Sequence, residues 1–190
     1  MVSTRPSARQ RLLEAADRLF YSEGVHTVGI DKVIQEAGVA KGSLFYNFSG
    51  KDDLVAAYLE GRDQRRRDRI ARHQQGLKDP IEKLLAIFDA LNEAVAAPGY
   101  RGCAFANANA EALPGSVEAK ALRTFRDWFA DTLLALCKEA GFTDAADVAA
   151  RLGLLYDGAV ANSQLDTHPD AVRLAKELAS MVLNSSPRTT

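Results

Sequence analysis

Apolar residues recur three and four positions apart along most of the chain, the spacing that places them on one face of an α-helix. Prolines and glycines separate the segments that carry this pattern. The pattern predicts helices over residues 7–23, 30–37, 41–47, 49–73, 79–97, 116–141, 144–164 and 169–184, with a short segment over 103–112 between turns. We therefore predict an all-α protein, with only residues 185–190 frayed.

The first third contains two short predicted helices joined by a glycine. Val33 and Ala37 lie on one face of the first short helix, and Gly38 allows a sharp turn after it. Two short helices packed on a longer leading helix form a helix-turn-helix, whose second helix enters the major groove of DNA. Leu44 and Phe48, four residues apart, are predicted to belong to the core of this part.

Charge is distributed unevenly although the net charge is only −1. Residues 1–73 hold 13 Lys and Arg against 10 Asp and Glu, whereas residues 74–190 hold 11 against 15. A basic first third favours a polyanionic partner. Arg5, Arg9 and Arg11 could form a basic arm that contacts DNA. The arginines at helical spacing further along are predicted to form a solvated, ion-paired face or to contact the other domain instead: Arg62, Arg65, Arg66, Arg69 and Arg72.

A longer run of residues carries a family resemblance. It comprises Leu12-Leu13-Glu14-Ala15-Ala16, Leu19-Phe20, Gly24, Ile30, Val33-Ile34, Ala37-Gly38-Val39, Lys41-Gly42-Ser43-Leu44-Phe45, Phe48 and Lys51-Asp52-Asp53-Leu54. This run closely resembles the tetracycline-repressor (TetR) family of bacterial regulators. The resemblance implies a homodimer of nine or ten helices per chain, with a DNA-binding domain over residues 1–54, a helix bridging to about residue 73, and an effector-binding and dimerisation domain over 55–190. It also implies a repressor that leaves its operator when a small molecule binds.

The resemblance assigns DNA contacts by position. The residues implied are Thr27, Lys41, Gly42, Ser43, Phe45, Tyr46, Asn47 and Lys51. Their chemistry suits these roles, because lysine donates to guanine and asparagine pairs with adenine, while Thr27, Tyr46 and Lys51 would hold phosphates. The chain departs from the family at Gly29, Ala40, Phe45 and Asn47. Ala40 forgoes a helix-cap bond worth about 1 kcal/mol.

Most aromatic residues follow the first third, where the family holds its effector. The candidate ligand-binding residues are Phe88, Leu91, Cys103, Phe105, Asn107, Phe125, Trp128, Phe129, Tyr156 and Asp157. Apolar walls with a few polar groups are typical of small-molecule sites. For the aromatic residues, plain core packing is the alternative interpretation.

The last two predicted helices are apolar on more than one side, which predicts burial on both sides. Leu152 and Leu155 lie on one face of the first of them, Leu154 and Leu165 lie elsewhere, and Leu178 offers matching surface on the second. A homodimer through these two helices is the natural prediction.

Other chemistry is sparse. An enzyme with Cys103 as nucleophile is the alternative to a regulator, but no histidine lies near it in sequence to act as a base. The chain could also activate transcription or sense a protein. The histidines lack metal-ligand spacing, so we expect no metal and no cofactor. No apolar run reaches membrane-spanning length, and the start lacks an export segment. We therefore expect a cytoplasmic protein without a membrane partner.

Overall fold

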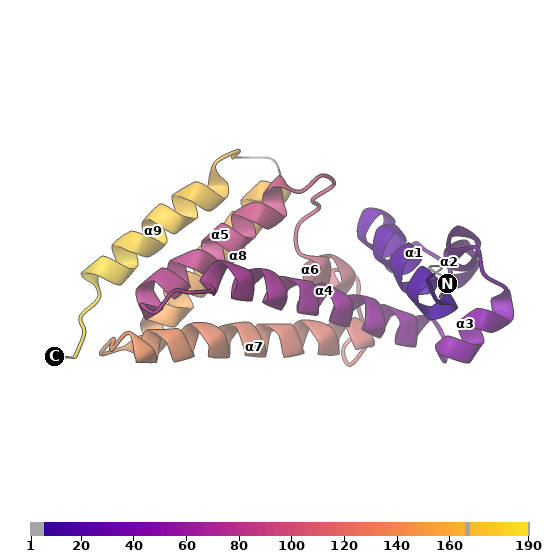
Figure 1. Cartoon of the computed structure of the whole chain (residues 1–190), viewed down its shortest axis with the longest axis horizontal. Coiled ribbons are helices and arrows are strands. Elements are labelled where there is room, and N and C mark those ends of the chain that lie inside the picture. Colours follow the sequence, from indigo (N-terminus) through magenta and orange to yellow (C-terminus); the bar gives the residue numbers. More distant parts are fainter. Residues whose placement is uncertain (1–5, 166–167, 190) are drawn as a thin grey trace. The chain divides into compact units, whose positions relative to one another are not determined.

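A computed structural model describes residues 6–165 and 168–189. This part of the chain folds into nine helices, and its isolated β-bridge joins Phe142 to Arg188 (Figure 1). The prediction of an all-α protein is confirmed. No helix in the described ranges is both long enough and apolar enough to cross a membrane.

Three helices build the start of the chain: α1 (Ala8–Glu23), α2 (Ile30–Ala37) and α3 (Lys41–Asn47). Ser7 caps α1 by accepting a hydrogen bond from the Gln10 amide at 3.1 Å. Neither Gly29 before α2 nor Ala40 before α3 supplies a side-chain cap. The start of α3 therefore lacks the side-chain bond that a serine or threonine would provide.

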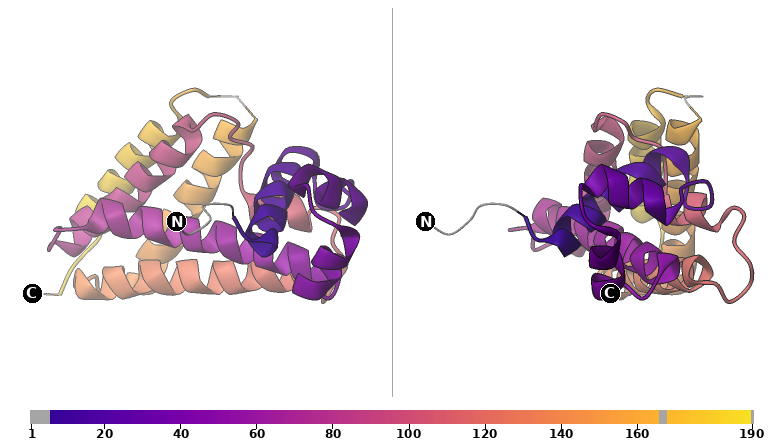
Figure 2. Two further views of the ribbon diagram at one scale, coloured as in Figure 1. Left: turned by 45° about the vertical axis from the view of Figure 1, so that its right-hand side comes forward. Right: turned by 90° about the vertical axis from the view of Figure 1, so that its right-hand side faces the viewer.

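The helices that follow are α4 (Lys51–Gln74), α5 (Pro80–Ala96), α6 (Ala104–Asn109), α7 (Val117–Glu139), α8 (Ala145–Gln164) and α9 (Ala171–Ser185). Asp79 caps α5 with proline at its first position, and Asp144 caps α8. Both helices therefore begin where the sequence predicted. Helices α5, α8 and α9 pack side by side (Figure 2).

The chain divides into two compact units. Among the described residues, 6–64 and 103–123 form the first unit, and 65–102, 124–165 and 168–189 form the second. The first unit contains α1, α2, α3, α6 and the beginnings of α4 and α7, whereas α5, α8 and α9 belong to the second. Because α4 and α7 each begin in the first unit and end in the second, each links the two units covalently.

The core of the first unit is built from apolar side chains of its first helices and of the beginning of α4. Leu12 of α1 and Leu44 of α3 are fully buried, and Phe48 is 3% exposed. Phe20 meets Tyr58 of α4 edge to face, with ring centroids 5.6 Å apart. The prediction that Leu44 and Phe48 are core residues is confirmed.

The end of the chain is not frayed up to Thr189, which corrects the prediction for residues 185–189; Thr190 lies outside the described residues. The Thr189 amide donates to the Gly141 carbonyl at 2.8 Å, and the Thr143 amide donates to the Pro187 carbonyl at 3.0 Å. The Arg188 guanidinium lies over the Phe142 ring at 5.1 Å. These contacts join residues far apart in sequence, which no local pattern indicates.

Candidate DNA-binding and effector sites

The turn between α2 and α3 is held by a glycine and an arginine. Gly38 adopts the left-handed conformation (φ 60°, ψ 43°), which costs other residues about 1 to 2 kcal/mol. Arg11 of α1 donates from Nη1 to the carbonyls of Ala37 and Gly38 at 3.2 and 2.8 Å. Arg11 therefore ties α1 to the turn between α2 and α3. The prediction that Arg11 belongs to a basic arm is wrong. Arg5 lies outside the described residues.

Helix α3 has one buried and one exposed side. Leu44 packs into the core, while Phe45 is 51% exposed and Tyr46 is 90% exposed. Lys41 and Gly42 are also exposed, and Ser43 and Asn47 are half-buried. The residues predicted to contact DNA are therefore the ones that the fold of the first unit leaves accessible.

The polar groups of α3 already have partners within the unit. The Asn47 amide donates to the Ser43 carbonyl at 2.7 Å, and Lys41 Nζ lies 3.0 Å from the Asp31 carboxylate. For Asn47 to pair with a base, its amide must exchange this local bond for one to the base edge. A recess of about 560 Å³ adjoins this surface and is lined by Ser7, Ala8, Arg9, Gly42, Ser43, Tyr46 and Asn47.

The predicted phosphate contacts outside α3 lie at the ends of neighbouring helices. Thr27 is exposed in the loop before α2, and Lys51 is the half-buried first residue of α4. Asp53, in the first turn of α4, accepts a hydrogen bond from the Ser49 amide just before the helix at 2.9 Å. Because the start of a helix disfavours a cation, Lys51 gains nothing from its own helix.

The α4 arginines are used inside each unit. In the first unit, Arg62 pairs with Asp17 at 2.6 Å and lies over the Tyr21 ring at 3.8 Å. In the second unit, Arg69 and Arg72 pair with Glu93 at 3.4 and 2.8 Å. The prediction of an ion-paired face is confirmed for these three arginines. A hydrogen bond from His73, helped by the two arginines, holds the pKa of Glu93 below its usual value.

Five predicted effector residues form an aromatic cluster in the second unit. The ring centroids of Phe129 and Tyr156 lie 4.6 Å apart, and those of Phe88 and Tyr156 lie 6.2 Å apart. Phe125 stacks on Phe129 at 5.9 Å, and Trp128 lies 6.3 Å from the same ring. The structure thus brings these five aromatic side chains together on α5, α7 and α8. Leu91 is buried on α5.

Two further arginines of α4 cover this cluster. The Arg66 guanidinium lies 4.1 Å from the Phe125 ring centroid, and the Arg67 guanidinium lies 4.0 Å from that of Trp128. Cations over aromatic faces contribute about 0.5 to 2 kcal/mol, more when water is excluded. The cluster therefore has positive charge at its edge.

Asp157 has a different setting. It forms an ion pair with Arg126 at 2.6 Å. Both residues, with Phe129, line a groove of about 430 Å³ between α7 and α8. Asp157 is therefore paired within the unit, and its carboxylate is available to a ligand only in competition with Arg126.

The remaining predicted effector residues belong to the first unit. Phe105 is 2% exposed, whereas Cys103 and Asn107 are half-buried, all at or within α6. Near the end of α6, the Ala108 carbonyl accepts a hydrogen bond from His26 Nε2 at 3.2 Å. His26 lies in the loop between α1 and α2, so this bond ties α6 to the helix-turn-helix.

The second cysteine has no exposed thiol. Cys137 is fully buried, and burial raises the pKa of its thiol to about 11. A thiol with so high a pKa carries almost no thiolate at neutral pH and is inert.

Sequence reasoning missed Asp31 and His26. Asp31 and Lys41 have opposite charges but lie on different helices, so no helical spacing connects them. His26 and Ala108 are 82 residues apart. Only the helix-turn-helix resemblance, used to place α2 against α3, could have suggested the first pair.

Comparison with known proteins agrees with this arrangement. Residues 12–58 match the family model described as bacterial regulatory proteins, tetR family. The TetR-family transcriptional regulator SCO4454 from Streptomyces coelicolor has a similar crystal structure, with a TM-score of 0.87, 35% identity, and coverage of 93% of this chain and 94% of that one.

The curated relatives match over different shares of the chain. The HTH-type transcriptional regulator LmrA of Bacillus subtilis is 34% identical over 86 residues, which span 45% of this chain and 46% of that protein. The chain thus spans about half the length of that relative. The transcriptional regulator AcuR of Cereibacter sphaeroides is 27% identical over 175 residues, 86% of this chain and 79% of that protein. Given the helix-turn-helix and the similarity to SCO4454 over nearly the whole length, the chain belongs to the TetR family of DNA-binding transcriptional regulators, a non-enzymatic family.

Proposed function

We propose that this regulator is a homodimeric repressor that binds operator DNA through α3 and leaves it when a small molecule binds the second unit. The observation that carries the DNA part is the two-sided α3, with Leu44 buried and Tyr46 90% exposed beside Lys41 and Gly42. A helix fixed by its apolar side presents its polar side to the major groove. We assign DNA binding to residues 1–54, with α4 as the bridge, and effector binding and dimerisation to residues 55–190.

The DNA contacts in this proposal divide by chemistry. Lys41, Ser43 and Asn47 would meet base edges, with Gly42 allowing close backbone approach and Phe45 contacting a thymine methyl. Thr27, Tyr46 and Lys51 would bind phosphates, which set the position of the protein without reading the sequence. Because the site is on the chromosome, we also propose a cytoplasmic location.

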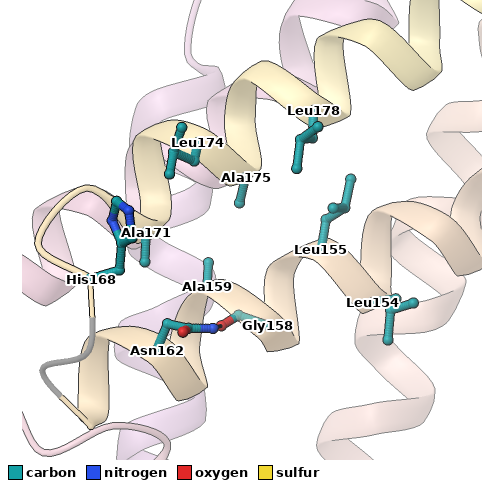
Figure 3. Close-up of a pocket in the computed structure, with 10 residues that line it drawn as sticks. All are labelled: Leu154, Leu155, Gly158, Ala159, Asn162, His168, Ala171, Leu174, Ala175 and Leu178. Carbon is teal, nitrogen blue, oxygen red and sulfur yellow. Dashed lines mark hydrogen bonds between the residues drawn. The ribbon is translucent and has the colours of Figure 1, made fainter.

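The dimer part rests on a groove between α8 and α9 of about 270 Å³ (Figure 3). Its lining is almost entirely apolar: Leu154, Leu155, Gly158, Ala159, Asn162, His168, Ala171, Leu174, Ala175 and Leu178. Figure 3 shows Leu155 and Leu178 projecting between the two helices. Leu154 is 75% exposed and Leu178 is 49% exposed in the single chain. A second copy that places its own α8 and α9 here would remove these leucines from water.

The small residues on this surface support the same proposal. Gly158 and Ala159 lie next to each other on α8, while Ala171 and Ala175 lie one turn apart on α9. Side chains this short allow the backbones of two helices to approach closely. A four-helix seam of α8 and α9 from each chain is the arrangement that uses this surface.

The effector part rests on the aromatic cluster of the second unit. Phe88, Phe129 and Tyr156 are in mutual or successive ring contact, and Arg66 and Arg67 lie over neighbouring rings. These rings are almost fully buried, and the open space beside them is the groove of about 430 Å³ that Phe129 lines with Arg126 and Asp157. We propose that an apolar molecule with one polar or charged group binds in this groove. We keep Leu91, Phe125, Trp128 and Asp157 of the same unit as further candidate ligand contacts, whereas the other predicted contacts, Cys103, Phe105 and Asn107, belong to the first unit and are not part of this cluster.

Coupling to DNA would pass along the chain through α7 and α6. Helix α7 begins in the first unit and carries Phe125, Trp128 and Phe129 in the second. The short α6 precedes it, and the bond from His26 to the Ala108 carbonyl connects α6 to the loop before α2. A ligand that shifts α7 would therefore change the position of α6 and, through His26, that of the helix-turn-helix.

One experiment tests the proposal from DNA to effector. Duplexes selected from a random pool define the operator, and a panel of aromatic carboxylates and neutral aromatic compounds is then screened for release. Trp128 is the single tryptophan, so its emission reports binding at the cluster without a label. We expect compounds that change this emission to weaken operator binding by about 5- to 150-fold. Compounds that change the emission and strengthen or leave unchanged operator binding would contradict release.

The variant His26→Ala tests the coupling route. It should leave the affinities for operator alone and for compound alone nearly unchanged while reducing the release effect, since the bond to α6 is lost. The matched control is His73→Ala, which removes a histidine that bonds Glu93 within the second unit and belongs to none of the proposed DNA, dimer or effector surfaces. If a compound weakens operator binding of His26→Ala as much as that of the unmodified protein, the coupling between effector and DNA binding does not pass through His26.

A further inference from the structure

The predicted base-reading lysine is held by an acidic residue of the other helix of the motif. Lys41 is the first residue of α3, and its Nζ lies 3.0 Å from Oδ1 of Asp31 in the first turn of α2. Both side chains are exposed, at 63% and 77%. The pair therefore lies on the surface that α2 and α3 present together, beside the exposed Gly42 and Tyr46.

Stability does not explain this pair. Exposed ion pairs contribute little to stability, because water screens the two charges and both side chains lose conformational freedom. The helix dipole favours Asp31 at the start of α2 but disfavours Lys41 at the start of α3. The main effect of the carboxylate is thus local: it neutralises the charge of Lys41 where DNA is expected to bind.

A carboxylate at this position acts against binding to phosphates in general. On unrelated DNA, Lys41 could contact a phosphate only by exchanging Asp31 for it, and the abandoned carboxylate would then lie near the negative backbone. Exchanging Asp31 for a phosphate therefore adds little to the affinity for unrelated DNA. A surface without Asp31 would bind any duplex more tightly.

On the preferred sequence the same pair need not break. The ammonium group of lysine has three donors, so Lys41 can keep Asp31 and still donate to guanine O6 or N7. The carboxylate also restricts the lysine to positions near the start of α3. The Lys41 side chain then loses less conformational freedom when it contacts a base. A phosphate contact still requires Lys41 to give up its pairing with Asp31.

We propose that Asp31 is a specificity-determining residue, which acts through Lys41 by penalising sequence-independent binding and directing the ammonium group to a base edge. The inference rests on the proposed role of Lys41 in DNA binding. Asp31 is a positioning residue in this account, and its effect is on the ratio of operator to unrelated-DNA affinity rather than on stability.

The first unit contains a matched control pair. Glu36, near the end of the same helix α2, pairs with Arg18 of α1 at 2.8 Å, and both side chains are largely exposed. None of the residues predicted to bind DNA takes part in this pair. Glu36→Gln removes the same charge from the same helix as Asp31→Asn and leaves Lys41 held.

The experiment measures binding of the full-length protein to the selected operator and to a scrambled duplex at several salt concentrations. We expect Asp31→Asn to tighten binding to the scrambled duplex by about tenfold at low salt. Operator binding should tighten by about threefold or less, so the ratio of operator affinity to scrambled-duplex affinity falls. The salt slope on the scrambled duplex should steepen by roughly two per dimer, one released counterion per subunit. Asp31→Ser should act like Asp31→Asn, and Asp31→Glu should retain most of the original ratio.

Two outcomes would overturn the inference. The first is an unchanged affinity ratio in both Asp31→Asn and Asp31→Ser. The second is an equal fall in the ratio for Glu36→Gln, which would make net charge alone the cause. In a Lys41→Ala background, the change at Asp31 should no longer direct any base contact, and the ratio should stay at the Lys41→Ala value.

The Lys41→Ala variant alone separates this inference from the one it rests on. If it leaves operator affinity and the affinity ratio unchanged, the DNA role of Lys41 fails. If it weakens operator binding while both Asp31 variants keep the original ratio, only the role of Asp31 fails.

Discussion

The two exposed surfaces that carry the proposed function differ in chemistry. The α3 surface of the first unit presents Lys41 and Asn47, whose polar groups bond to Asp31 and to the Ser43 carbonyl, and Tyr46, which is exposed to solvent. The α8–α9 surface of the second unit presents Leu154 and Leu178 to solvent. Exposure to water therefore costs the polar α3 surface little free energy, whereas it is unfavourable for the apolar α8–α9 surface.

This difference indicates how permanent each partner should be. Burying apolar surface gains about 25 cal/mol per Å², and contiguous exposed apolar patches mark interaction sites. The exposed leucines of α8 and α9 therefore favour a permanent protein partner. A polar, charged surface gains mainly by releasing counterions from DNA, which salt and small structural changes reverse. The comparison predicts a constitutive dimer and a reversible DNA complex.

The strongest way to break the comparison is to place a charge on the apolar surface. Leu155→Arg would bury an unpaired cation against its symmetry mate, so we expect monomers in sedimentation. Operator affinity should fall by about 10² to 10⁴, because the two half-sites are then bound independently. Leu113→Arg is the control, since Leu113 is 77% exposed and lies in the first unit. A Leu155→Arg dimer with normal operator affinity would place the interface elsewhere.

The next largest effect concerns base readout on the polar surface. Asn47→Ala should cost about 1 to 3 kcal/mol per half-site on the operator and little on a scrambled duplex, because a base-edge partner is lost. Titration of both duplexes gives the two numbers. Equal weakening on both would make Asn47 a phosphate contact like Lys51.

A smaller effect is expected at the start of α4. Lys51→Ala should weaken binding to every duplex by a similar factor and reduce the salt slope by roughly two per dimer, as one phosphate contact is lost from each subunit. Salt titrations on operator and scrambled duplexes measure it. A loss confined to the operator would show that Lys51 reads a base.

The smallest effect concerns the buried thiol, which contrasts with both surfaces. In a Cys103→Ser variant, Cys137 should stay unmodified by iodoacetamide in the folded protein and react once the protein is unfolded. Because burial raises its pKa to about 11, the folded state keeps a proton that the unfolded state releases. The contribution of Cys137 to the free energy of unfolding is therefore constant at neutral pH and falls as the pH rises from about 9 to about 11. Rapid labelling of the folded variant would contradict this burial.

Local signals made the helices predictable. Gly38 ends α2 in the left-handed conformation, and Asp79 with Pro80 begins α5, as their residue types indicate. The split of α3 into buried and exposed sides also follows from the apolar pair Leu44 and Phe48. These features depend on residues a few positions apart.

Contacts between distant residues were not predictable in the same way. The bond from His26 to Ala108, the pairing of the chain end with the loop at Gly141, and the ion pair of Asp157 with Arg126 each join separate helices or loops. Arg11 was expected to contact DNA as a basic residue near the start, but its position against the α2–α3 turn gives it carbonyl partners instead. Residue type indicated the charge of this side chain, and only the fold decided its partner.

The most direct test of the account is sedimentation of the complex formed with the selected operator duplex, combined with the sequence of that duplex. The account predicts chains bound in pairs and a pseudo-palindromic site whose half-sites are about 34 to 36 Å apart, or a multiple of this distance. Saturation at one chain per duplex, on a sequence without two-fold symmetry, would contradict the claim that the apolar α8–α9 surface makes the dimer that the polar α3 surface uses on DNA.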